Sequence, residues 1–246
     1  MSNPVFFVRP EALTASICRI DGDEGHHAAT VKRLRVGEPV DVCDGQGGRG
    51  TGTVLAATKD TVDVRVLRVT REPVEPVRFA VVQALAKGDR AELAIEMLTE
   101  LGVSDIYPWG AQHSVAKWDD DKTQAKWQRV AREASKQSRR AWIPTVHGVV
   151  TTSQVTRMVT EAQVALVLHE SARSSLADVP VPQRGEVLVV VGPEGGLAPG
   201  EVDMLETAGG RVVRMGNTVL RTSTAGSAAL AVLASKTPLW SARMES

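Results

Sequence analysis

The sequence GEVLVVVGPEGG, residues 185–196, joins an uninterrupted aliphatic run to a glycine-rich loop. Residues 187–191 read Val-Leu-Val-Val-Val, and such a run bounded by glycine is typical of a strand buried on both faces of a parallel sheet. The three glycines of the loop would let the backbone approach a ligand closely. A tight turn explains the same glycines equally well. The stretch therefore predicts a buried strand and leaves the role of its loop open.

Strands and helices alternate on both sides of this stretch. Residues 79–86 have the pattern of a second buried strand, and 88–102 follow as an amphipathic helix ended by Gly102. This alternation predicts an α/β domain with a mainly parallel sheet. Further strands are expected at 104–109, 145–150, 163–170 and 210–216, and further helices over 122–140, from about 152, at 199–208 and at about 222–236.

The first seventy residues have a different pattern, in which short strands are separated by tight turns. Short strands of this kind indicate a small barrel. The two prolines within residues 71–77 indicate a linker. The sequence therefore predicts two domains, a β-barrel at 1–73 and the α/β domain at 74–246. The elements expected in the barrel are strands at 40–43, 50–57 and 61–69 and one helix at 24–34.

Length and composition are those of an ordinary globular protein, with 246 residues and 43% hydrophobic content. No apolar run approaches the roughly 18 residues of a membrane helix, and the first residues lack the pattern of a signal peptide. The two cysteines, Cys18 and Cys43, match no metal-binding or redox spacing. These features favour a protein of the reducing cytoplasm.

The charges are balanced, 29 basic against 29 acidic, and a zero net charge argues against a nucleic-acid partner. Their distribution is uneven, however. Residues 122–140 carry seven basic side chains and one acidic one, which leaves 22 basic and 28 acidic residues elsewhere. The basic stripe suits contact with RNA phosphates, although a solvated helix face explains it as well. The side chains expected on one helical face are Lys122, Lys126, Arg129, Lys136 and Arg140.

A second loop begins at Met215, at the end of the strand expected at 210–216, and leads into a helix of small residues. Thr222 or Ser223 is suited to cap this helix. Arg221 lies at the helix start, where the helix dipole favours anions. A cation kept at such a place is a candidate for binding substrate or stabilising negative charge. An ordinary surface ion pair is the alternative interpretation.

Common catalytic and nucleotide-binding motifs do not occur in this sequence. It contains no GxGxxG after a strand, no GxxxxGK[ST] and no Gly-x-Ser-x-Gly elbow. The five histidines are scattered, so no zinc-binding set emerges. We therefore expect no metal.

Taken together, several short segments in a fixed order resemble the RsmE family, bacterial methyltransferases of the SPOUT class that act on 16S ribosomal RNA. Each segment is a weak signal alone, but their order and spacing across about 200 residues are specific. The segments lie at 27–35, 44–45, 87–90, 100–103, 133–140, 191–197 and 220–222.

The resemblance implies a PUA-like β-barrel that binds RNA, followed by an α/β domain tied in a trefoil knot. Members of the family bind S-adenosylmethionine in the knot, work as homodimers and methylate N3 of one uridine in the decoding region, here expected within the 30S subunit. The small-residue helix at 225–235 would suit a close dimer interface. The implied cofactor contacts are Leu168, His169, Gly192, Pro193, Glu194, Gly195, Gly196, Met215, Gly216, Asn217, Val219 and Leu220.

By the same resemblance, Arg221 lies beside the transferred methyl. From the chemistry, we hypothesise that Arg221 stabilises the anion left when uracil N3 loses its proton. Family members often read Leu-Arg-Thr-Glu-Thr, whereas this chain has Ser223 in place of the glutamate. A serine cannot replace a carboxylate as a base, so the base is left open among Glu194, His169 and solvent.

The target base must be unpaired or flipped, because its N3 is engaged in base pairing in a duplex. The candidate RNA contacts are His27, Arg33, Arg35, Lys136, Arg139 and Arg140.

Two other functions remain open. One is a ribose 2′-O-methyltransferase of the same class, and the other is a catalytically silent RNA-binding assembly factor.

Overall fold

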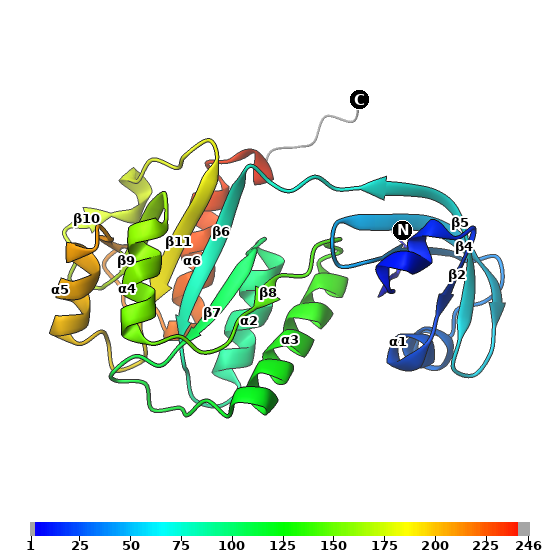
Figure 1. The fold of residues 1–246 in the computed structure, drawn as a ribbon, viewed down its shortest axis with the longest axis horizontal. Coiled ribbons are helices and arrows are strands. Elements are labelled where there is room, and N and C mark those ends of the chain that lie inside the picture. Colours follow the sequence, from blue (N-terminus) through cyan, green and yellow to red (C-terminus); the bar gives the residue numbers. More distant parts are fainter. Residues whose placement is uncertain (1–2, 241–246) are drawn as a thin grey trace. The chain divides into compact units, whose positions relative to one another are not determined.

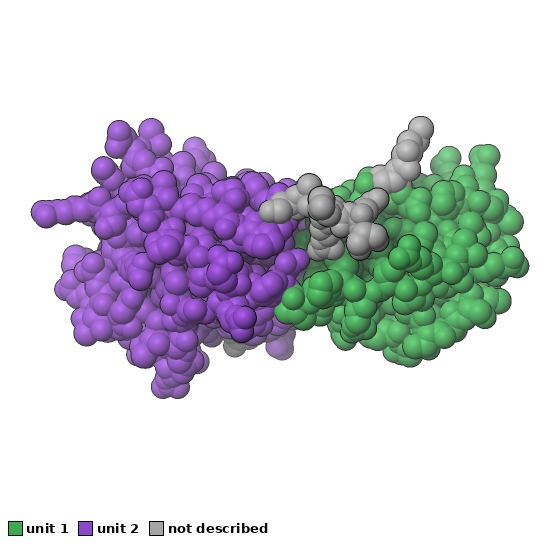
Figure 2. Space-filling model, turned by 90° about the horizontal axis from the view of Figure 1, so that it is seen from above, with its two compact units in different colours: residues 1–74, 135–143 green, residues 75–134, 144–246 purple. Residues whose placement is uncertain are grey.

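The computed structural model describes residues 3–240, which separate into two compact units (Figure 2). Unit 1 comprises the chain up to Val74 together with Ser135–Ile143, and unit 2 comprises the remainder. The chain thus leaves unit 1, returns to it for nine residues, and leaves again. The boundaries expected from the sequence did not include this return.

Unit 1 is built on a five-stranded sheet in the order β1-β3-β4-β5-β2. Its core contains Phe6, Ile20, Val42 and Val64, all nearly or completely inaccessible to solvent. The strands predicted at 40–43, 50–57 and 61–69 are confirmed, whereas two shorter ones were not predicted. The strands are β1 (Val5–Phe7), β2 (Ile17–Ile20), β3 (Pro39–Cys43), β4 (Gly48–Ala57) and β5 (Val62–Arg71).

The helix predicted at 24–34 is a compound element in unit 1. Helix α1 (Gly22–His26) continues directly into one π-helical stretch, His27–Val31. The chain then leaves the helical path at Arg33, which has φ of +55°. Exposed left-handed residues other than glycine are uncommon, so this end is a special local conformation rather than a frayed helix.

Unit 2 contains a seven-stranded sheet in the order β10-β12-β9-β11-β6-β7-β8, and all its strand pairs are parallel (Figure 1). This arrangement confirms the α/β domain that the alternation predicted. The strands are β6 (Val77–Ala84), β7 (Asp105–Trp109), β8 (Thr145–Val146), β9 (Val164–Leu168), β10 (Ser174–Ser175), β11 (Gly185–Val191) and β12 (Arg211–Arg214).

Strand β11 explains why its sequence is aliphatic at every position. Val187, Val189 and Val191 belong to one hydrophobic core, whereas Leu188 and Val190 belong to another on the opposite face. Successive side chains of a strand point to opposite faces, so a strand covered on both sides needs no polar alternation.

Two layers of helices bury these two faces of the sheet. Residues of α2, α3 and α6 share a core with Val189, and residues of α4 and α5 share the other core with Leu188. Gly226 of α6 allows the close approach, because a Cβ at this position would lie 3.2 Å from Leu98 of α2. The helices are α2 (Arg90–Glu100), α3 (Asp120–Gln137), α4 (Thr152–Glu161), α5 (Pro199–Thr207) and α6 (Thr222–Ala234).

The prediction of one basic helical face over residues 122–140 is wrong at the C-terminal end of this range. Helix α3 ends at Gln137, so Arg140 lies beyond it and shares no helical face with Lys122. Arg139 adopts a left-handed backbone with φ of +57°, which turns the chain away from the helical path.

The chemistry of the two cysteines follows from their burial in unit 1. Cys18 and Cys43 are free and buried. Burial raises the pKa of the Cys18 thiol to about 11 and that of Cys43 to about 12. Because the thiolate is the reactive form, neither cysteine is a candidate nucleophile.

Within residues 3–240, no group of three or more His, Cys, Asp or Glu side chains could hold a metal ion. In the same part of the chain, no helix is long and apolar enough to cross a membrane.

Candidate functional site

A cleft of about 520 Å³ lies where β9, β11 and β12 end in unit 2. Ligands of open parallel sheets bind beyond the carboxyl ends of the strands, so this is the expected place for a site. Every predicted cofactor contact except Asn217 lines it. These residues are Leu168, His169, Gly192, Pro193, Glu194, Gly195, Gly196, Met215, Gly216, Val219 and Leu220.

The glycine loop after β11 is a folded turn supported from outside the cleft. The Gly196 amide donates to the Pro193 carbonyl at 2.9 Å, and Gly196 has φ of +74°. Its carbonyl lies 3.1 Å from His113 Nδ1. A Cβ on Gly195 would lie 3.1 Å from the His113 Cβ, so a side chain on the loop would crowd its support.

Glu201 fixes the far end of the same loop. This carboxylate is only 3% exposed and accepts a hydrogen bond from the Ala198 amide at 3.1 Å. It also accepts from the Gln112 amide at 2.9 Å and the Thr152 hydroxyl at 3.2 Å. A buried charge is tolerated when it is hydrogen-bonded in this way. Glu201 therefore ties together three segments around the cleft loop.

The second cleft loop is joined to the first through the start of α6. The Thr222 hydroxyl donates to the Gly192 carbonyl at 3.0 Å, and the buried Gln83 side chain donates to the Thr222 carbonyl at 3.3 Å. Arg221, the residue before the helix, is exposed and lines the cleft. These two contacts fix the backbone that carries its guanidinium.

Replacing Thr222 with valine is expected to lower the free energy of unfolding by about 1 kcal/mol, because the hydroxyl that bonds Gly192 is lost. Urea denaturation of the variant measures the change. Thr222→Ser keeps the hydroxyl and should lose less. Thr224→Val, at an exposed position of the same helix, is the matched control. An equal loss at both positions would contradict the link between the loops.

Ser223 stands where family members often have glutamate. It is not one of the described residues that line the cleft. Its side chain is buried, with 4% exposed. The site is therefore organised without a side-chain base at this position.

His169 and Glu194 differ in their fitness as a base. His169 Nδ1 accepts a hydrogen bond from the Ser171 amide at 3.2 Å, so the proton of the neutral ring lies on Nε2. In this tautomer Nδ1 is occupied by the Ser171 amide and Nε2 carries a proton, so the neutral ring has no free acceptor nitrogen. Glu194 is exposed and lines the cleft, which leaves it and solvent as the available proton acceptors.

Several cleft residues were not among the predicted contacts, including Arg90, Glu170 and Thr218. Arg90 begins α2, which is the next element after β6 in the chain. A signal for it existed, because β6 was predicted as a buried strand and its end lies at the same edge of the sheet. The segment 87–90 carries part of the family resemblance, but the resemblance implies no role for Arg90.

The predicted RNA contacts all belong to unit 1. Arg33, Arg35 and Arg139 are exposed, and His27 is half-buried, with its ring edge-on to Phe6 at 6.1 Å between centroids. Their role as RNA contacts stays a prediction. Arg140 is partly buried, which lowers its pKa to about 10 and leaves it charged at neutral pH.

Lys136 is a correction to the predicted RNA contacts. Its side chain is only 6% exposed, and its Nζ lies 3.2 Å from Glu24 Oε2. A buried ammonium paired with a carboxylate has little surface to offer a phosphate. Its position near the end of α3 holds that end against α1 within unit 1 instead.

Comparison with known proteins agrees with this geometry. Residues 73–234 match the family described as the RNA methyltransferase domain, and residues 20–67 match the RNA methyltransferase PUA domain. The fold and site therefore define an RNA methyltransferase. The predicted fold class is confirmed, whereas the trefoil knot stays a prediction.

A curated relative in Mycobacterium bovis, ribosomal RNA small subunit methyltransferase E, is 44% identical over 97% of this chain and 94% of its own length. A solved structure of the methyltransferase of that name from Neisseria gonorrhoeae, bound to S-adenosyl methionine, is 25% identical with a TM-score of 0.84 and covers 95% of this chain and 98% of its own. A putative methyltransferase from Legionella pneumophila with the same cofactor bound is 27% identical with a TM-score of 0.88 over 96% and 99% of the chains. This chain belongs to the family of ribosomal RNA small subunit methyltransferases E, as its sequence predicted.

Proposed function

We propose that this protein transfers a methyl group from S-adenosylmethionine to N3 of one uridine in the decoding region of 16S ribosomal RNA, in the 30S subunit. The observation that carries the proposal is the cleft with two glycine-containing loops and an exposed arginine, Arg221, at the start of α6. A ribosomal substrate places the reaction in the cytoplasm.

The cleft fits a nucleoside cofactor by size and lining. Its volume of about 520 Å³ falls in the range of about 300–1,000 Å³ for small-molecule sites. Leu168, Val219 and Leu220 supply apolar surface, and the glycines of the loop at 192–196 let the backbone approach a ligand closely. These residues would hold the cofactor, which brings an electrophilic methyl group to the site.

The chain's own contribution is alignment and charge. Uracil N3 is a nucleophile once its proton has left, and the resulting anion is spread over N3 and the flanking oxygens. The Arg221 guanidinium stabilises that anion from a fixed backbone, in the manner of a preorganised oxyanion site. Glu194 or solvent receives the proton.

RNA is held by unit 1 in this proposal. The exposed cations Arg33, Arg35 and Arg139 contact the phosphates of an unpaired segment, together with the half-buried His27 and Arg140. Lys136 is excluded from the set by its burial.

The homodimer is proposed from the family resemblance alone. Within α6, Ala225, Gly226 and Ala229 are buried in unit 2, whereas Ala228 and Ala231 are half-buried and remain accessible to a partner copy.

The deciding experiment compares methyl transfer to 30S subunits and to free 16S RNA, both taken from a strain that lacks the enzyme. Nuclease digestion and mass spectrometry then locate the methyl group. Methyl on N3 of a single uridine supports the proposal, and methyl on a ribose 2′-oxygen replaces it with the alternative transferase. Calorimetry that detects no binding of S-adenosylmethionine would instead favour a silent assembly factor.

A further inference from the structure

The returning segment Ser135–Ile143 is tied into unit 1 by its backbone. The Gly47 amide donates to the Ala141 carbonyl at 3.0 Å, and the Ile143 amide donates to the Gly45 carbonyl at 3.0 Å. At the start of the segment, the Arg140 amide donates to the Ser135 carbonyl at 2.9 Å. The turn between these contacts contains Arg139.

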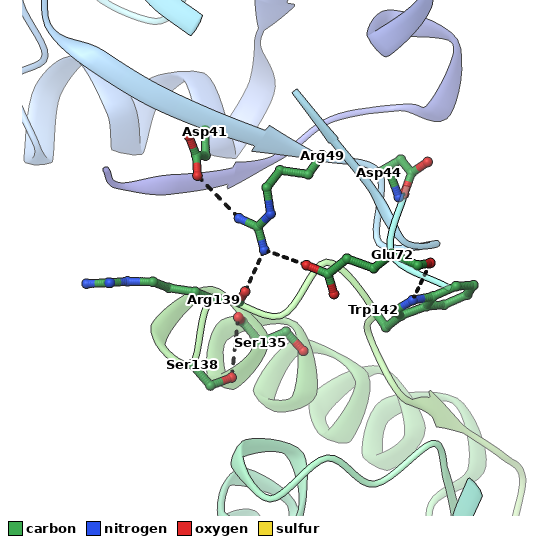
Figure 3. Close-up of polar contacts among 9 residues, drawn as sticks. Asp41, Asp44, Arg49, Glu72, Ser135, Ser138, Arg139 and Trp142 are labelled. Carbon is green, nitrogen blue, oxygen red and sulfur yellow. Dashed lines mark hydrogen bonds and ion pairs between the residues drawn. The ribbon is translucent and has the colours of Figure 1, made fainter. Parts of the chain in front are cut away.

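The guanidinium of Arg49, on β4, contacts this turn (Figure 3). One guanidinium nitrogen lies 3.3 Å from Asp41 Oδ2, and the other lies 3.2 Å from Glu72 Oε1. The second nitrogen also donates to the Arg139 carbonyl at 2.7 Å. The Arg49 side chain is only 18% exposed, so its charge is neutralised by Asp41 and Glu72 rather than presented to solvent.

Arg139 itself is directed away from the cluster, and its side chain is exposed (Figure 3). Its φ of +57° is a conformation that glycine adopts freely and arginine adopts at a cost. Among the described residues, only Arg33 and Arg139 have positive φ without being glycine, and both are exposed arginines of unit 1. Local strain kept at a particular side chain points to a function for that side chain.

We propose that Arg49 is a positioning residue for RNA binding: its guanidinium holds the Arg139 carbonyl and thereby presents the Arg139 side chain to an RNA phosphate. The inference rests on the proposed function in that it needs an RNA substrate. It does not depend on which atom of the RNA is methylated.

The test is a double-mutant cycle on binding to 30S subunits, combining Arg49→Lys with Arg139→Ala. Lysine keeps the charge but lacks the planar fork that reaches two carboxylates and a carbonyl together. Each single variant is expected to weaken binding on the order of tenfold, the effect of one charge-assisted contact. The double variant should bind no more weakly than Arg139→Ala alone. In every variant, the slope of log affinity against log salt should fall by about 1.

Arg139→Gly separates the structural role of this position from its functional role. Relief of the left-handed strain should raise Tm by about 2–4 °C, while RNA binding falls as in the alanine variant. Arg19→Lys is the matched control. Arg19 on β2 makes a two-pronged ion pair with Asp63 on β5, which the lysine variant cannot reproduce. This variant should nevertheless bind 30S subunits as the wild type does.

Additive losses in the cycle, or an unchanged salt slope in Arg139→Ala, would overturn the proposal. If Arg49→Lys fails to fold, the Arg139 variants still decide, because normal binding by both would overturn it. Binding is measured without cofactor, so a wild-type protein that binds 30S subunits but transfers no methyl would count against the proposed function and leave this inference standing.

Discussion

Replacing Arg221 with alanine is expected to slow methyl transfer by about 10²- to 10³-fold, the effect of removing one preorganised donor from an oxyanion-type site. The affinity for S-adenosylmethionine should change little, because the loss falls on charge that develops only during the reaction. Single-turnover transfer to 30S subunits measures the rate, and calorimetry measures cofactor binding.

Two further variants sharpen this result. Arg221→Lys should retain part of the rate, since it keeps a positive charge without the planar donor geometry. Arg211→Ala removes an exposed arginine of β12 that does not line the cleft, and its rate should match wild type. An Arg221→Ala enzyme that turned over at full rate would exclude the proposed role.

Replacing Glu201 with alanine should lower the free energy of unfolding by about 3–5 kcal/mol, because it orphans the donors of a buried, charge-assisted network. The Ala198 and Gln112 amides would lose their acceptor. The loss corresponds to a fall in Tm of about 10 °C. Differential scanning calorimetry provides the measurement, and cofactor affinity should fall with the loosened loop.

The control for Glu201 is on the same helix. Asp203→Ala removes an exposed carboxylate of α5 and should change stability by no more than about 0.5 kcal/mol. If both variants unfold at the wild-type temperature, Glu201 does not support the loop as described.

The sheet of unit 2 was predictable because its signals are local and strong. The run at 187–191 identifies a strand covered on both faces, and the two cores divide its residues alternately. The cleft followed from the same information, since parallel strands place their carboxyl ends together and two of the loops there are unusual in sequence. Arg221 was predictable as a site residue because a cation is unfavourable at a helix start.

The end of the basic helix could not be predicted in this way. The charge pattern continues with helical spacing through Arg140, and only the backbone of Arg139 shows that the helix has ended. Sequence periodicity also does not reveal that Lys136 finds Glu24, which is 112 residues away in the chain. Long-range partners of this kind decide whether a charge is buried or exposed, and they depend on the tertiary fold.

The return of Ser135–Ile143 into unit 1 bears on how the protein can be divided. A fragment cut in the linker after Val74 would lack the residues that bond Gly47 and Gly45, and its Arg49 would lose the Arg139 carbonyl. The complementary fragment would carry those residues without their partners. Unit 1 is therefore a discontinuous domain, formed by two separate segments of the chain. An RNA-binding fragment that folds by itself would need the segment Ser135–Ile143 joined back onto it.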